Sequence, residues 1–236
     1  MSEFDVQSTE QVGLEKEVKR RGGGVMIART ALLLDFDDTI FNTTGYKALR
    51  DEYYKQKFDE KFWQRFKKYE HDYATGQVKT FNLPDVLTDK ELSITNRHLK
   101  EIAPSLLYED FKTFIGKIDD DHFFPMILTF GEKELQDTKI AAVGIDLPII
   151  HTESKNKTEV IGRWRSHDSY HINGSDFKKV VLIDDRQSNF VDFDKLPNAR
   201  GFLVQRAGVD PKFDLDSLPK NVSVVSGLDE ISLDAS

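Results

Sequence analysis

The chain contains no cysteine, and this absence removes three kinds of chemistry at once. Without thiols there can be no disulfide, no thiolate nucleophile and no thiolate-bound zinc. The absence fits a reducing compartment, and we expect a cytoplasmic protein. No apolar run approaches the roughly 20 residues that cross a membrane, and the first residues lack the apolar segment of a secretory signal.

Positive charge is also in short supply. Lys and Arg number 33 against 41 Asp and Glu, which gives a formal net charge of -8. This acidic balance argues against nucleic acid and against an anionic membrane as partners, because both attract basic surfaces. The histidines lack metal-ligand spacing, and no serine-hydrolase elbow or Gly-rich phosphate loop occurs. At 236 residues the chain suits one domain with a sizeable insertion, or two small domains.

The most informative stretch is residues 31–41, where an uninterrupted apolar run ends abruptly in acids. Ala-Leu-Leu-Leu suits a strand that is covered on both faces in a parallel sheet. Asp35, Asp37 and Asp38 follow, and unpaired charge is too costly inside a sheet. We therefore place them at the C-terminal edge, where open α/β sheets bind ligands. Taken alone, Asp and Thr after a strand are also ordinary turn and helix-cap residues.

Asp35 and Asp37 point the same way along an extended path, while Phe36 points away. Two carboxylates about 4 Å apart repel by roughly 4 kcal/mol at an effective dielectric of about 20. Either a proton or a cation has to relieve that repulsion. The sequence thus predicts a site that holds a cation or carries out proton chemistry at this strand end.

Three more strand ends carry polar residues. The run 179–183 repeats the opening design and ends in Asp184 and Asp185. The short apolar run 125–128 ends in Thr129 ahead of a helix, whose N-terminus offers unpaired donors to an anion. The run 147–150 is followed by Lys155 and Lys157 at the start of an amphipathic helix. Asn189 and Ser188 could orient the second acid pair or cap the helix that follows.

These four strand ends resemble the motifs of the haloacid dehalogenase superfamily. Residues 35–39 match its first motif, Asp-x-Asp-x-Thr. Thr129 resembles the second motif, although Phe130 stands where many members have Asn. Lys157 fits the third motif best, with Lys155 as the alternative, and Asp184-Asp185 resembles the fourth.

The resemblance implies a role for each of these residues. Asp35 is implied as the nucleophile and Asp37 as the acid/base. The implied phosphate ligands are Thr129, Lys157 and the backbone amide of Phe36. The implied cofactor is Mg²⁺, and its ligands are given as Asp35, Asp37, Asp184 and Asp185, with Asp185 weighted above Asp184.

Residues 43–123 differ in character from the rest of the chain. Aromatic residues such as Phe62, Phe66 and Tyr73 recur there at helical spacing, and Pro84 and Pro104 interrupt the pattern. Such a stripe is usually helix core, and the alternative is a surface that stacks on a ligand. The resemblance implies a C1 helical cap that covers the site and selects the substrate.

The predicted fold is therefore α/β, a doubly wound, mostly parallel sheet with an inserted helical cap. We expect a flexible N-terminal leader over residues 1–24, an α/β core over 25–42 and 124–236, and the cap over 43–123. The predicted function is Mg²⁺-dependent hydrolysis of a small soluble phosphomonoester through an aspartyl-phosphate. A phosphotransferase or mutase would share every catalytic residue, and a protein phosphatase and a non-catalytic binding module remain alternatives. The oligomeric state stays open.

Overall fold

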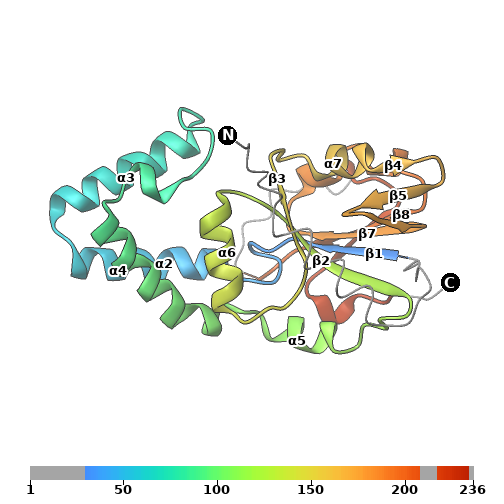
Figure 1. The fold of residues 1–236 in the computed structure, drawn as a ribbon, viewed down its shortest axis with the longest axis horizontal. Coiled ribbons are helices and arrows are strands. Elements are labelled where there is room, and N and C mark those ends of the chain that lie inside the picture. Colours follow the sequence, from blue (N-terminus) through green and yellow to red (C-terminus); the bar gives the residue numbers. More distant parts are fainter. Residues whose placement is uncertain (1–29, 208–216, 234–236) are drawn as a thin grey trace, which may run out of the picture.

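The computed structural model describes residues 30–207 and 217–233 (Figure 1). The leader predicted over 1–24 lies outside these residues, as does the start of the core segment at residue 25. The centre of the fold is a parallel sheet of six strands in the order β3-β2-β1-β7-β8-β9. Its strands are β1 (Thr30–Leu34), β2 (Phe123–Phe130), β3 (Ile149–Thr152), β7 (Lys179–Asp184), β8 (Ala199–Val204) and β9 (Val222–Val225). The parallel sheet confirms the predicted doubly wound α/β class.

Strand β1 lies in the middle of this sheet and is buried on both faces. Leu32 and Leu34 pack into the cluster on one face, while Ala31 and Leu33 pack into the cluster on the other. The side chains of a strand alternate between faces, so a strand covered on both sides is apolar along most of its length. The uninterrupted apolar run from Ala31 to Leu34 has that cause, and Thr30 at the start of β1 is polar.

Helices α2 (Thr43–Lys57), α3 (Glu60–Ala74) and α4 (Asp89–Ile102) lie between β1 and β2 in the sequence. They gather at one end of the molecule, away from the sheet (Figure 1). Asn42, Asp59 and Thr88 cap their N-termini with side-chain oxygens, which satisfies backbone donors that a helix start leaves free. Thr88 and Glu91 form a reciprocal capping box.

Most of the aromatic stripe forms the interior of this helical group. Tyr54, Phe62, Phe66, Leu83 and Leu87 are buried together in one cluster. Leu49 of α2 is the large apolar residue of this helical group that is most exposed among the described residues, at 41%. Core packing is therefore the main role of the stripe, as the usual behaviour of such stripes predicts.

Helix α5 (Glu109–Ile115) follows the helical group but packs beside the sheet. Phe111 and Phe114 join the cluster that contains Leu32 and Leu34 of β1. The short 3₁₀ segment η3 (Ala103–Leu106) precedes α5 and also contributes to that cluster through Ala103 and Leu106. The last turns of the insertion are thus part of the apolar interior beneath the sheet.

Two helices and a small second sheet complete the core. Helix α6 (Lys133–Ala142) follows β2, and α7 (Lys157–Arg163) follows β3. Strands β4 (Arg165–Ser166), β5 (Ser169–Ile172) and β6 (Ser175–Phe177) form an antiparallel sheet that the sequence analysis did not anticipate. Asn173 and Gly174 both have positive φ at the β5–β6 turn, as a tight hairpin requires. No helix among the described residues has the length and apolarity needed to cross a membrane.

Candidate active site

The two acidic strand ends meet at one edge of the sheet. Strands β1 and β7 are parallel neighbours, with Leu34 opposite Ile183. Asp35 follows directly after β1 and Asp184 is the last residue of β7. The backbone N–H of Asp35 donates to the carbonyl of Ile183 over 2.8 Å, which ties the two ends together. Their carboxylates are therefore held side by side by the register of the sheet.

Lys157 joins these two carboxylates. It is the first residue of α7, and Asn156 caps that helix with its side chain. Its ammonium group contacts Asp35 and donates to Asp184 over 2.6 Å, and the residue is only 1% exposed. Of the two lysines that the sequence left open, Lys157 is the one that contacts Asp35. The ammonium group of Lys155 instead lies over the rings of Tyr73 and Phe130.

Asp184 and Asp185 have different surroundings. Asp184 is fully buried and accepts from Lys157, from the backbone N–H of Arg186 and from the Asn189 amide, the last two over 2.8 Å each. Asn189 thus orients Asp184. Of the two roles that the sequence left open for Asn189, orienting the acid pair or capping the next helix, this contact favours the first. Within the described residues no hydrogen bond reaches the carboxylate of Asp185, which is partly exposed. Asp184 therefore has its partners in the protein, while Asp185 has an open carboxylate.

The carboxylates of Asp35, Asp184 and Asp185 form a compact oxygen-only group. One oxygen of each lies within 4.8 Å of the others. Burial, opposed by Lys157 and assisted by Asp184, raises the pKa of Asp35 to about 7. Burial together with Asp35 and Asp184 raises the pKa of Asp185 to about 9. Such crowding of acids is the arrangement that a hard cation such as Mg²⁺ relieves, and an oxygen donor set fits that ion.

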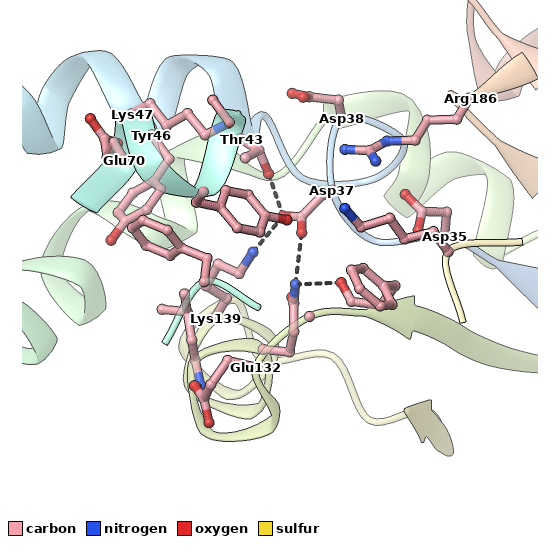
Figure 2. A pocket seen from close by; sticks show the side chains of 18 of the residues that line it. Asp35, Asp37, Asp38, Thr43, Tyr46, Lys47, Glu70, Glu132, Lys139 and Arg186 are labelled. Atoms are coloured by element: carbon pink, nitrogen blue, oxygen red, sulfur yellow. Dashed lines mark hydrogen bonds and ion pairs between the residues drawn. The ribbon is translucent and has the colours of Figure 1, made fainter. Parts of the chain in front are cut away.

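The carboxylate of Asp37 is turned to a different set of partners (Figure 2). It contacts Lys139 and the Thr43 hydroxyl and accepts from the Gln136 amide over 2.8 Å. Burial acts to raise its pKa, but Lys139 and these hydrogen bonds outweigh it and lower the pKa to about 2. Asp37 is thus a fixed carboxylate at neutral pH, and it does not belong to the group formed by Asp35, Asp184 and Asp185.

The sequence analysis missed the two partners on α6. Gln136 and Lys139 are 4% and 3% exposed, and they occupy the buried face of this helix beside Ile140. A signal was present, because polar residues stood at positions where the helical period of α6 predicts core. A buried lysine needs a carboxylate partner, but no pattern in the neighbouring sequence indicated that the partner of Lys139 is Asp37.

Thr129 is the second-to-last residue of β2, which is the neighbour of β1 on the side opposite to β7. Ile127 pairs with Leu34, so Thr129 stands beside the segment that carries Asp35 and Phe36. Its hydroxyl is buried and has no hydrogen-bond partner among the described residues, and the residue is only 1% exposed. The Phe36 side chain is fully buried and stacks on Phe41 at 5.0 Å, so only its backbone is available to a ligand.

A cavity of about 410 Å³ opens over this edge of the sheet (Figure 2). Its wall includes Asp35, Asp37 and Lys157 from the core and Tyr46 and Tyr73 from the helical group. Thr129, Asp184 and Asp185 are not part of that wall. The fold and this site together define a doubly wound α/β protein whose helical insertion contributes to the wall of a cavity beside an acidic strand-end centre.

Comparison with known proteins identifies the fold more closely. No family model and no curated protein sequence matches the chain. A haloacid dehalogenase-like hydrolase from Burkholderia xenovorans aligns over 87% of this chain and 99% of its own, with a TM-score of 0.61 and 16% identity. The HAD hydrolase YfnB from Bacillus subtilis, solved bound to magnesium, aligns over 85% and 96%, with a TM-score of 0.53 and 16% identity. The chain has the fold of the haloacid dehalogenase-like hydrolases, which confirms the predicted resemblance at the level of the fold.

Proposed function

We propose that this protein is a Mg²⁺-dependent phosphomonoester hydrolase that acts through an aspartyl-phosphate on Asp35. One observation carries the proposal. Lys157 bridges Asp35 and Asp184 in the buried floor of the site, with the open carboxylate of Asp185 beside them. A carboxylate nucleophile needs a fixed orientation and a nearby positive charge, and this arrangement supplies both.

Asp35 and Asp185 are the proposed principal ligands of the cation. Asp184 supports it from within the fold, and Asp37 stays a predicted ligand. When bound, Mg²⁺ supplies positive charge that offsets the anionic nucleophile and the anionic phosphoryl group. The oxygen-only donor set and the magnesium bound to YfnB, which shares the fold, support this choice of ion.

In the first step a carboxylate oxygen of Asp35 attacks phosphorus. The bond from phosphorus to the ester oxygen breaks, and the departing alkoxide takes a proton from Asp37. Asp37 is ionised as the structure describes it, so it must first gain that proton. That proton comes from solvent once the anionic substrate has entered the cavity, because a nearby negative charge raises the pKa of a carboxyl group.

In the second step Asp37 removes a proton from water, and that water attacks the phosphorus of the aspartyl-phosphate. The bond between phosphorus and the Asp35 oxygen breaks, which releases phosphate and restores the carboxylate. The low pKa of Asp37, about 2, keeps it in the ionised form that this step requires, and the proton it takes from water passes on to solvent. Lys157, the Thr129 hydroxyl and the Phe36 and Asp37 amides are the proposed ligands of the phosphoryl oxygens.

The size of the cavity supports a small soluble phosphorylated metabolite as substrate. Its volume of about 410 Å³ lies within the range of about 300–1,000 Å³ for small-molecule sites. The helical group contributes part of the wall, and a polymer would have to pass it. Charge and composition supply no reason to expect nucleic acid or a membrane.

The test is a phosphatase screen against a panel of phosphorylated metabolites, with and without Mg²⁺. We expect phosphate release that depends on Mg²⁺ from at least one member of the panel. Phosphate that appears on an added acceptor alcohol instead of in solution would identify a phosphotransferase. A protein that binds Mg²⁺ but releases and transfers no phosphate would contradict the proposal.

A further inference from the structure

Six cationic side chains line the cavity, and they fall into two groups. Arg50, Lys139 and Lys157 each have a carboxylate partner. Lys47, Lys155 and Arg186 have no ion pair within the described residues, although all three line the same wall. A cation that faces a cavity without a counter-charge is a candidate for recognising an anionic ligand.

The carboxylates in that wall do not supply the missing counter-charges. Glu70 is paired with Arg50 and Lys67, and Glu132 caps α6 by accepting from two backbone N–H groups. Asp38 accepts from the backbone N–H of Thr44 over 2.9 Å. Asp185, and then Asp35 and Asp184, attract Arg186 electrostatically, but none of them forms an ion pair with it in the part of the chain that the structure describes. A cation bound there would offset that attraction.

Lys155 and Arg186 share the cavity wall with a residue near the end of α3, Tyr73. The Lys155 ammonium lies 5.4 Å from the centre of the Tyr73 ring and 5.6 Å from that of Phe130. Figure 2 shows Arg186 reaching over the cavity from the side opposite to Lys47. The pair therefore stands where the insertion meets the core.

We propose that Lys155 and Arg186 form a second anion site, so that the substrate is a phosphomonoester carrying a further anionic group. This inference rests on the proposed function, because the transferred phosphoryl group occupies the site at Asp35. Lys157, which is paired within the buried floor, serves that phosphoryl group. The second anion lies against Tyr73 and Phe130, and the guanidinium of Arg186 can bind a carboxylate or a phosphate through two parallel hydrogen bonds.

The test compares substrates that differ only in the second charge. 3-Phosphoglycerate and glycerol 3-phosphate share a three-carbon skeleton, and one has a carboxylate where the other has a hydroxymethyl group. Fructose 1,6-bisphosphate and fructose 6-phosphate form a second pair, so the two arms separate a carboxylate from a phosphate as the preferred anion. We expect kcat/KM to favour the charged member of at least one pair by about tenfold or more, since hydrogen bonds to charged groups are among the strong ones.

Three variants locate the preference. Lys155→Gln and Arg186→Gln should each bring the ratio of kcat/KM between charged and uncharged substrate close to one, through KM more than kcat. Lys47→Gln is the matched control, because it removes one unpaired positive charge from the same cavity on the opposite side. It should leave the ratio as in the wild type. An equal loss of preference in all three variants would contradict a defined site and indicate general electrostatic attraction.

Binding separates a failure of this inference from a failure of the proposed function. Calorimetry on the Asp35→Asn variant measures affinity for each pair without turnover, with circular dichroism to verify its fold. Turnover of p-nitrophenyl phosphate without any preference for a charged substrate would overturn the second anion site and leave the hydrolase proposal standing. Tighter binding of the charged member without turnover of any compound would support the anion site and refute the hydrolase. Neither turnover nor preference would refute both.

Discussion

The ammonium group of Lys139 contacts the carboxylate of Asp37, although 102 residues separate them in the sequence. Lys139 is 3% exposed and also lies over the rings of Phe36 and Phe41, at 5.4 Å and 5.7 Å from their centres. The contact fixes α6 to the loop that follows β1. It also holds the predicted acid/base as a carboxylate, so one ion pair serves both the fold and the site.

Lys139→Met should therefore destabilise the protein by about 3–5 kcal/mol, because it leaves the Asp37 carboxylate partly buried without its counter-charge. Urea unfolding measures the change in the free energy of unfolding. The second substitution Asp37→Asn removes the unpaired carboxylate and should restore part of the lost free energy of unfolding. Lys133→Gln on the same helix is the control, since its pair with Asp137 is exposed and such pairs contribute about 0–1 kcal/mol. Equal effects of the two lysine substitutions would contradict this account of the pair.

Asp35→Asn should abolish phosphate release while the fold stays intact, since the amide preserves volume but cannot act as the nucleophile. Asp38→Asn is a matched control in the same acidic run. Asp38 has a φ of 56°, a backbone conformation that Asn also tolerates. We expect the control to retain activity within a few-fold. Rates near the wild type in Asp35→Asn would remove Asp35 from the mechanism.

Thr129→Val separates function from stability with particular clarity. The buried hydroxyl has no partner in the described part of the chain, so its removal should leave the free energy of unfolding unchanged or slightly raised. If the hydroxyl binds a phosphoryl oxygen, its removal should nevertheless lower kcat/KM by about tenfold.

Thr95→Val in α4 should show the reverse pattern. Its hydroxyl donates to the Leu92 carbonyl over 2.9 Å in the helical group. The loss should lower the free energy of unfolding by about 1 kcal/mol with no change in turnover. If Thr129→Val lost stability but kept full activity, the hydroxyl would have a structural role.

Asp185→Ala should weaken the response to Mg²⁺ strongly. A ligand that binds only the folded state raises the melting temperature, so Mg²⁺ should stabilise the wild type in a concentration-dependent way. In the variant this shift should need at least about tenfold more Mg²⁺, and so should half-maximal activity. An unchanged metal titration would point to Asp184 as the main ligand instead.

The acidic edge of the sheet could be predicted from the sequence because its cause is local. The apolar runs before Asp35 and Asp184 form strands inside the sheet, where unpaired charge is too costly, so the carboxylates must lie at the strand ends. Parallel strands bring those ends together at one edge. The placement of a lysine at the site was implied by the resemblance to the third motif of the haloacid dehalogenase superfamily, and the amphipathic helix favoured Lys157 over Lys155.

The partners of Asp37 could not be predicted because the contact depends on tertiary packing. Lys139 and Gln136 were visible only as polar residues on a face that should be buried. Arg206 is a similar case. Arg206 lies two residues after the end of β8, and its guanidinium donates to Asp110 of α5 and to the Thr39 carbonyl. These two hydrogen bonds join the segment after β8 to α5 and to the first motif, across 96 and 167 residues. No periodicity or turn signal encodes contacts at such separations.

The most direct measurement of the central claim is to identify the residue that carries the phosphoryl group during turnover. The protein is mixed with a substrate and Mg²⁺, quenched in acid within the first turnover, digested, and analysed by mass spectrometry. We predict the mass of one phosphoryl group on the peptide that contains Asp35, and its absence from the Asp35→Asn variant. A phosphoryl group on any other residue, or phosphate release with an unmodified Asp35 at every time point, would contradict the account.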